Sequence, residues 1–140
     1  MTNSTVSSAN LPAQRTNQDW AALAARILLA AIFVLAGANK LSDPAGTIGY
    51  IQSVGIPLPE FAYAGAVAVE LLGGLALIVG FKARQIAMLL AAFSVVTAAV
   101  FHIEISDQVQ FVMFFKNIAI AGGFLMIAAF GPGRISLDRG

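Results

Sequence analysis

Four long apolar stretches dominate the chain, and short polar segments separate them. They cover residues 20–41, 61–81, 83–102 and 109–130. Each is close to the roughly 20 residues that an α-helix needs to cross a hydrocarbon core of about 30 Å. Their apolar residues surround the helix rather than forming one stripe, and they lack the alternation of β-barrel strands. The pattern predicts an all-α polytopic membrane protein built as a bundle of four transmembrane helices.

The longest connection, between the first two spans, contains the signals of a short additional helix. Asp43 can cap a helix N-terminus, Pro44 suits the first helical position, and Gly55 can end the helix. Apolar side chains between them favour a position at the membrane surface. We therefore predict an interfacial helix over residues 44–54.

The segments outside the predicted transmembrane domain (residues 20–133) are polar. Residues 1–19 are rich in Ser, Thr and Asn, and such a segment buries too little apolar surface to offset ordering. We expect a disordered N-terminal tail there and a cytoplasmic C-terminal tail over residues 134–140. Residues 36–38 resemble a signal-peptide cleavage site, but the first apolar stretch is too long for a signal peptide and is interpreted as a retained helix.

Basic residues are distributed unequally between the two sides of the predicted bundle. The side opposite the termini has Lys40, whereas the side of the termini has Arg15, Lys82, Arg84, Arg134 and Arg139. Because Lys and Arg accumulate in cytoplasmic segments, both termini are predicted to face the cytoplasm.

Composition narrows the classes of function. Hydrophobic residues make up 59% of the chain and charged residues 11%, with a net charge of +1. Average soluble domains are about a quarter charged, so a soluble enzyme is a poor fit. The small net charge offers no patch for nucleic acid. Cysteine is absent, which excludes disulfides, thiolate catalysis and Cys-ligated metals.

Charged residues inside the spans are the main candidates for a site, because each costs about 2.5–3.5 kcal/mol at membrane depth unless it is paired or used. Glu70 and Lys116 are expected about 14 and 10 Å from the outer side, and Arg26 about 9 Å from the cytoplasmic side. The helical phases point all three inward. Glu70 is therefore predicted to meet Lys116 or Arg26, either in a ligand pocket or as an ion pair that fixes helix register.

Three further residues complete the predicted pocket. Lys40 and His102 lie near the outer ends of their spans, where they can exchange protons with a ligand, although Lys40 can also snorkel and His102 can simply end its helix. Asn117 is more typical of an interhelical hydrogen bond. His102 with Glu104 and Asp107 is a weak metal pattern, so no metal site is predicted. No catalytic residue is assigned.

The order of these motifs resembles the DoxX family of small four-helix membrane proteins over residues 20–140. The resemblance rests on Arg26, residues 33–41, residues 55–59, residues 69–74, Gly80, Arg84, His102, Lys116-Asn117 and residues 131–134.

The resemblance implies an inner-membrane oxidoreductase component. DoxD-like relatives belong to a thiosulfate:quinone oxidoreductase, and other members are linked to oxidative-stress complexes with a superoxide dismutase and a sulfurtransferase. This chain lacks the cysteines of thiol-redox four-helix proteins, so electron transfer would need a bound quinone or a partner's cofactor.

The resulting expectation is a component that binds a quinone or another small amphiphile within a membrane oxidoreductase or stress-response complex. No covalently bound cofactor is expected, and the partners are the lipid bilayer, proteins of the redox complex and further copies of the chain. Two alternatives stay open: a non-catalytic assembly or chaperone-like membrane protein, and a small transporter subunit.

Overall fold

The computed structural model describes the backbone of residues 11–138 and the side chains of residues 16–138. Its regular elements, in chain order, are α1 (Leu11–Ser42), α2 (Pro44–Ser53), α3 (Pro59–Ala68), the π-helical turn η2 (Val69–Gly73), α4 (Gly74–Val79), α5 (Ala83–Phe101) and α6 (Gln108–Phe130). The elements α3, η2 and α4 follow one another without a break and form one long helix. Within the described residues the fold is all-helical, as predicted.

Among the described residues, four helices are long and apolar enough to cross a membrane. They are Thr16–Ser42, Pro59–Val79, Ala83–Phe101 and Gln108–Phe130, and each covers one of the four predicted apolar stretches. The short helix α2 also forms where expected, because the Asp43 carboxylate accepts a hydrogen bond from the backbone N–H of Gly46 at 2.9 Å. Gly55, with φ +80°, follows it.

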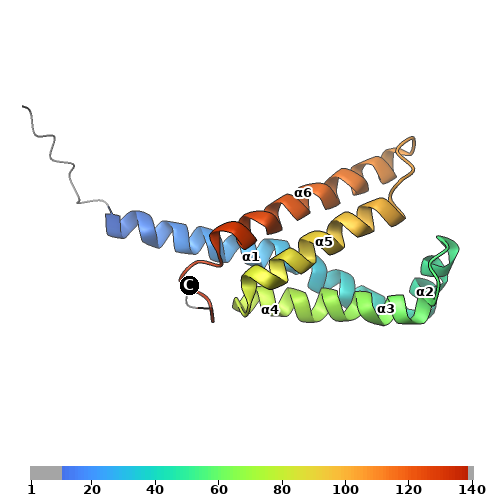
Figure 1. The fold of residues 1–140 in the computed structure, drawn as a ribbon, viewed down its shortest axis with the longest axis horizontal. Helices are drawn as coiled ribbons and strands as arrows, with labels where there is room; N and C mark the ends of the chain where they lie inside the picture. The colour runs from blue at the N-terminus through green and yellow to red at the C-terminus, as the bar shows by residue number, and fades with distance from the viewer. Residues whose placement is uncertain (1–10, 139–140) are drawn as a thin grey trace, which may run out of the picture.

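The helices are arranged as two pairs that meet at one end (Figure 1). One pair is the hairpin of α5 and α6, and the other is α1 alongside the long helix α3–α4. The pairs lie close together near the α4–α5 connection and diverge toward the end where α2 lies. We call these the α4–α5 end and the α2 end.

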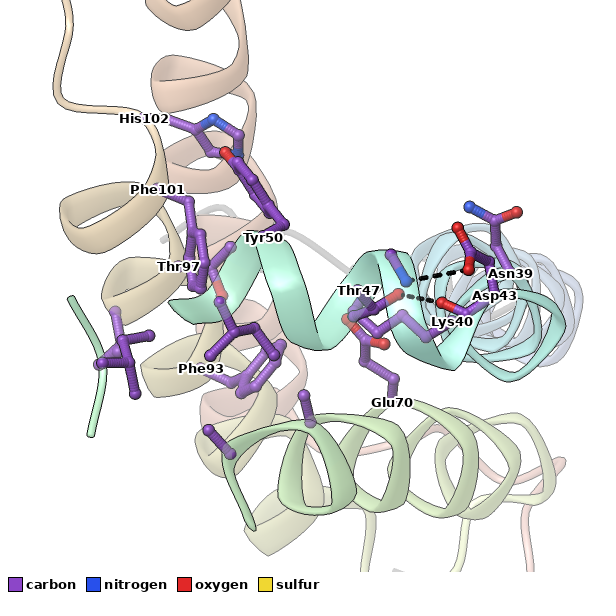
Figure 2. A pocket seen from close by; sticks show the side chains of 16 residues that line it. Asn39, Lys40, Asp43, Thr47, Tyr50, Glu70, Phe93, Thr97, Phe101 and His102 are labelled. Carbon is purple, nitrogen blue, oxygen red and sulfur yellow. Dashed lines mark hydrogen bonds and ion pairs between the residues drawn. The ribbon is translucent and has the colours of Figure 1, made fainter. Parts of the chain in front are cut away.

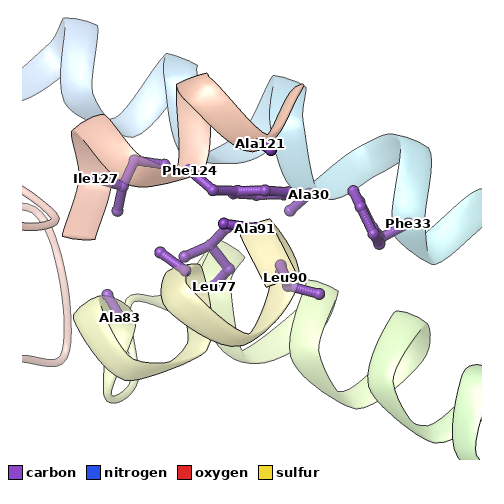
Figure 3. Close-up of a cluster of buried hydrophobic side chains, with 10 residues drawn as sticks. Ala30, Phe33, Leu77, Ala83, Leu90, Ala91, Ala121, Phe124 and Ile127 are labelled. Carbon is purple, nitrogen blue, oxygen red and sulfur yellow. The ribbon is translucent and has the colours of Figure 1, made fainter. Parts of the chain in front are cut away.

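A compact apolar cluster holds the two pairs together (Figure 3). Phe33 of α1 packs edge-on against Phe124 of α6, with ring centroids 5.2 Å apart. Leu77 and Leu90 fill the space between α4 and α5, and alanines around them permit close helix approach. Many large apolar side chains point outward instead, such as Leu28 at 74% exposure. Such an outer surface suits contact with lipid.

The first helix begins earlier than expected. Disorder was predicted over residues 1–19, but α1 starts at Leu11, so the prediction is wrong for residues 11–19, and residues 1–10 lie outside the described part. Low apolar content argues against burial, not against helix formation. Once a helix is nucleated in the adjoining span, extending it needs one favourable bond per residue. The Asp19 carboxylate also accepts a hydrogen bond from the Arg134 backbone N–H at 3.0 Å.

The predicted C-terminal tail is fastened to the α4–α5 end as far as residue 138. Leu137 donates a backbone hydrogen bond to the Val79 carbonyl at 3.0 Å. The Asp138 carboxylate accepts hydrogen bonds from the backbone N–H groups of Lys82 (2.9 Å) and Ala83 (2.6 Å). Asp138 thereby caps the N-terminus of α5, a role usually filled by a residue adjacent in sequence.

Gly37 allows α1 to approach the long helix, which leads to a first prediction. A Cβ atom at Gly37 would lie 2.7 Å from Leu71 Cγ, whereas a Cβ at Gly122 would meet nothing within 4 Å. We expect Gly37→Val to lower the free energy of unfolding by about 1–3 kcal/mol through overpacking. Gly122→Val is the matched control, and unfolding in detergent followed by circular dichroism is the measurement. Equal losses in both variants would contradict the prediction.

Candidate functional site

An ion pair between α1 and η2 lies at the centre of the candidate site. Lys40, in the last turn of α1, places its Nζ 2.8 Å from Oε1 of Glu70. Glu70 is 5% exposed, and its second oxygen, Oε2, has no hydrogen-bond partner among the described residues. Because buried polar atoms are nearly always hydrogen-bonded, this oxygen is a candidate contact for a ligand.

The local geometry of Glu70 comes from the π-helical turn. In η2 the backbone widens from the usual α-helical turn over Val69–Gly73, and π-bulges of this kind occur often at functional sites. Gly37 of α1 faces this turn, where a Cβ atom would lie 3.2 Å from Glu70 Cβ. The glycine therefore lets the backbone of α1 lie directly against Glu70. Hydrophobic periodicity does not indicate a π-turn, and the acidic residue itself was the available signal.

Two cavities adjoin the ion pair. The larger, about 610 Å³, lies between the ends of α1 and α5 and the helices α2 and α3, and we call it the α2 lobe. The smaller, about 170 Å³, reaches α6, and we call it the α6 lobe. The side chains shared by both walls are Lys40, Glu70, Phe93, Thr97 and His102.

The α2 lobe has one ionic end and one aromatic end. Figure 2 shows Lys40 and Glu70 toward one end, and Tyr50, Phe101 and His102 toward the other. The Tyr50 ring of α2 lies against the Phe101 ring of α5, with centroids 5.5 Å apart. This contact links α2 to the α5–α6 hairpin across the lobe. Neither aromatic ring was predicted to line a site, because an aromatic side chain in an apolar segment usually belongs to packing or to the membrane surface.

His102 is oriented by α6. Its Nδ1 lies 2.7 Å from Oε1 of Gln110. An amide oxygen only accepts hydrogen bonds, so Nδ1 is the donor and the neutral ring keeps Nε2 as an acceptor. His102 lines both lobes. It is thus equipped to take a proton from a hydroxyl group held there.

Lys116 and Asn117 line the α6 lobe together. The Lys116 ammonium lies 2.9 Å from the Met113 thioether sulfur, and thioethers are weak acceptors. The Asn117 amide donates to the Met113 carbonyl at 2.9 Å, a bond within α6 rather than between helices. The prediction that Asn117 forms a hydrogen bond to another helix is therefore wrong for its side-chain N–H group.

The predicted partners of Glu70 were wrong. Neither Arg26 nor Lys116 pairs with it, and its partner is Lys40. The depth estimate treated the spans as rods that end at equal levels. The Lys40–Glu70 contact instead places the last turn of α1 level with η2, in the second half of the long helix.

Arg26 lies away from the site, although it was predicted to belong to it. It is 1% exposed and donates a hydrogen bond to the Ile135 carbonyl in the C-terminal segment. It lines neither lobe. The C-terminal segment provides an acceptor much nearer than Glu70, since Arg26 and Lys40 are separated by about 20 Å along α1. The group of Lys40, Glu70, His102, Lys116 and Asn117 is otherwise brought together as expected.

A metal centre receives no support from the described residues. Within residues 11–138 no three His, Asp or Glu side chains gather in a metal-binding cluster. The five predicted residues that line the lobes instead provide one carboxylate, two ammonium groups, an imidazole and an amide. This combination suits hydrogen bonding, ion pairing and proton exchange with an organic ligand.

Comparisons with known proteins agree with the fold and its motifs. The chain is 40% identical over 122 residues to "Inner membrane protein YqjF" of Escherichia coli (strain K12), a match that covers 87% of this chain and 92% of that protein. It is 38% identical over 122 residues to "Inner membrane protein YphA" of the same organism, covering 84% and 87%. No solved structure matches the chain. The DoxX family profile matches residues 21–103, and with four apolar helices and these two inner-membrane relatives, the chain belongs to the DoxX family.

Proposed function

We propose that the protein binds a small amphiphile, quinone-like in its head group, as a component of an inner-membrane oxidoreductase or oxidative-stress complex. One observation carries the proposal: a buried carboxylate oxygen of Glu70 lacks a hydrogen bond at the wall of two cavities inside the bundle. Such an acceptor is costly unless a ligand or a proton occupies it.

The α2 lobe suits a flat, mostly apolar ligand with a few oxygen atoms. Its volume, about 610 Å³, lies within the range of about 300–1,000 Å³ typical of ligand pockets. Phe93, Tyr50 and Phe101 provide apolar walls. Lys40 retains donor capacity beyond its bond to Glu70, because an ammonium group has three hydrogens. A carbonyl oxygen of the ligand can accept from Lys40, and a hydroxyl group can donate to Glu70.

The same residues can manage protons. Glu70 and His102 line both lobes, one on η2 and one at the end of α5, and each has an atom that can accept a proton, Oε2 and Nε2. When bound, a quinone supplies two-electron, two-proton chemistry that this cysteine-free chain does not provide itself. Glu70 and His102 would then receive the protons of the reduced form, and the electrons would pass to a redox centre in a partner protein.

The proposal includes an orientation. Lys82, Arg84 and Arg134 lie at the α4–α5 end, which we place on the cytoplasmic side by the positive-inside rule. The α2 end and both lobes would then open toward the periplasmic half of the inner membrane. A ligand could enter from the lipid where the two helix pairs diverge.

Bound lipophilic compounds give the direct test. We expect wild-type protein purified in mild detergent to retain a compound that mass spectrometry detects after solvent extraction, and decylubiquinone to raise its unfolding temperature. Glu70→Gln should reduce both the amount of retained compound and the rise in unfolding temperature at least tenfold, because the anionic acceptor is lost. Glu60→Gln is the matched control, since Glu60 is an exposed carboxylate in the first turn of the same helix.

Two results would contradict the proposal. One is the absence of any enriched compound together with no response to decylubiquinone. The other is equal retention in wild type and Glu70→Gln. If the Lys40→Met/Glu70→Gln double variant still captures the same crosslinked partner proteins and no ligand is found, the ion pair serves only to hold the bundle together, and the protein acts as a non-catalytic assembly partner.

A further inference from the structure

The charges around the α6 lobe do not balance. Three ionisable side chains with formal charge line it: Lys40, Glu70 and Lys116. Lys40 and Glu70 form an ion pair at 2.8 Å, so their charges cancel. His102 also belongs to the lining and forms a hydrogen bond with Gln110 through Nδ1; its neutral form adds no charge to this sum. One positive charge, that of Lys116, remains.

The position of Lys116 makes the surplus charge significant. Lys116 lies more than two turns into α6, about 12 Å from the start of the helix. It is partly buried, and its ammonium contacts the Met113 sulfur. Among the described residues no carboxylate pairs with it. Charged groups at membrane depth usually face a partner or a wet pathway, and here the lobe is what Lys116 faces.

Asp43, the other carboxylate near the site, does not supply the missing charge. It lines the α2 lobe and not the α6 lobe. It is exposed, and its carboxylate accepts a hydrogen bond from the Gly46 N–H at the start of α2. Figure 2 shows Asp43 on the side of Lys40, away from His102 and the end of α5. Solvent and the α2 N-terminus therefore account for its charge.

We propose that the α6 lobe holds an anionic head group, a carboxylate or another singly charged oxyanion on a small apolar body, paired with Lys116 and lying beside Asn117. A single negative charge neutralises the lobe, whereas a dianion would leave an excess of negative charge in a low-dielectric site. The lobe, about 170 Å³, accommodates the head group, and the apolar body continues past Phe93 and Thr97 into the α2 lobe. This inference rests on the proposed function, that the lobes bind an amphiphile.

Two ligands that differ only in charge test the head group. Decanoate and decanamide have the same chain and nearly the same shape. With the full chain in phosphatidylcholine nanodiscs, we expect calorimetry to show that decanoate binds at least tenfold more tightly than decanamide. Lys116→Gln should remove this preference by weakening decanoate and not decanamide. Lys116→Arg keeps the charge and should keep the preference, and Lys82→Gln, at the opposite end of the bundle, should not change it.

Equal affinity of the wild type for the two ligands would overturn the proposal, as would a preference that survives Lys116→Gln. If the Gln variant does not fold, the wild type with the two ligands, measured against empty nanodiscs, still decides the first of these outcomes. Decylubiquinone in the same nanodiscs separates the two proposals. Binding of decylubiquinone without any preference for decanoate refutes the anionic head group alone, and the failure of all three ligands to bind refutes the amphiphile site itself.

Two competition arms identify the source of the anion. Replacing phosphatidylcholine by phosphatidylglycerol should suppress decanoate binding if a lipid head group fills the lobe. Excess acetate should suppress it if the natural anion is water-soluble. Suppression in either arm supports an anion site at Lys116, and persistence of decanoate binding in both arms supports a free amphiphile that brings its own charge.

Discussion

The Lys40→Met variant is expected to lose about 3–5 kcal/mol of unfolding free energy, the loss that is typical when a buried charge is left without its partner. Glu70 is 5% exposed and has one hydrogen-bonded oxygen, the one that contacts Lys40. Removing the ammonium leaves the carboxylate buried without compensation. The cost comes from this stranded charge rather than from the attraction between the two groups.

A second substitution shows whether the loss of stability comes from the unpaired carboxylate or from the missing attraction between the two groups. Adding Glu70→Gln to Lys40→Met removes the charge that was left unpaired, so the double variant should recover most of the lost stability. Unfolding in mild detergent, followed by circular dichroism, gives the free energies. Lys82→Met provides the control, because Lys82 is exposed at the other end of the bundle. Equal stability of Lys40→Met and Lys82→Met would show that the pair is not buried in the folded protein.

Deleting residues 134–140 should have an effect of similar size, about 4 kcal/mol. The deletion removes the Ile135 carbonyl, to which the Arg26 guanidinium donates, while Nε and Nη1 of Arg26 already lack partners. It also removes Asp138, which caps the N-terminus of α5, a contribution of about 1 kcal/mol. The larger part arises because Arg26 is 1% exposed and would lose its acceptor.

A double-mutant cycle separates these two parts. In an Arg26→Met background the deletion should cost only about 1 kcal/mol, since the buried charge is gone and only the cap is lost. The free energies of unfolding of the four proteins in detergent provide the measurement. A deletion that costs the same in both backgrounds would show that Arg26 does not depend on the C-terminal segment.

The fold follows closely from hydrophobic spacing, and the interior pairing does not. The predicted second span over residues 61–81 and the observed helix Pro59–Val79 agree because hydrocarbon thickness sets the length of any such segment. Glu70 could also be predicted as a site residue, because a carboxylate at membrane depth is costly unless it is paired or used. Its partner depends on how far α1 extends relative to η2, and neither residue type nor spacing encodes that offset.

The contacts of the C-terminal segment could not be predicted from the sequence either. Its Gly-Pro-Gly sequence indicates the end of a helix, and residues 134–140 contain few apolar side chains, so a tail was predicted. In the structure Leu137 and Asp138 bind the α4–α5 connection through backbone and carboxylate hydrogen bonds. These acceptors and donors become available only once α4 and α5 have met at that end. A contact between groups more than fifty residues apart leaves no local pattern in the chain.

Apolar length and charge content alone indicate four membrane helices, and the capping residues Asp43, Pro44 and Gly55 indicate the short helix between the first two. Length and charge suffice for the spans because a bilayer imposes its thickness and its intolerance of charge on every segment separately. The tertiary structure assigns Lys40 to Glu70, Arg26 to the C-terminal segment and Lys116 to a lobe whose carboxylate is already paired with Lys40. These pairings depend on the relative height and rotation of packed helices, which arise from the sum of many contacts across the bundle.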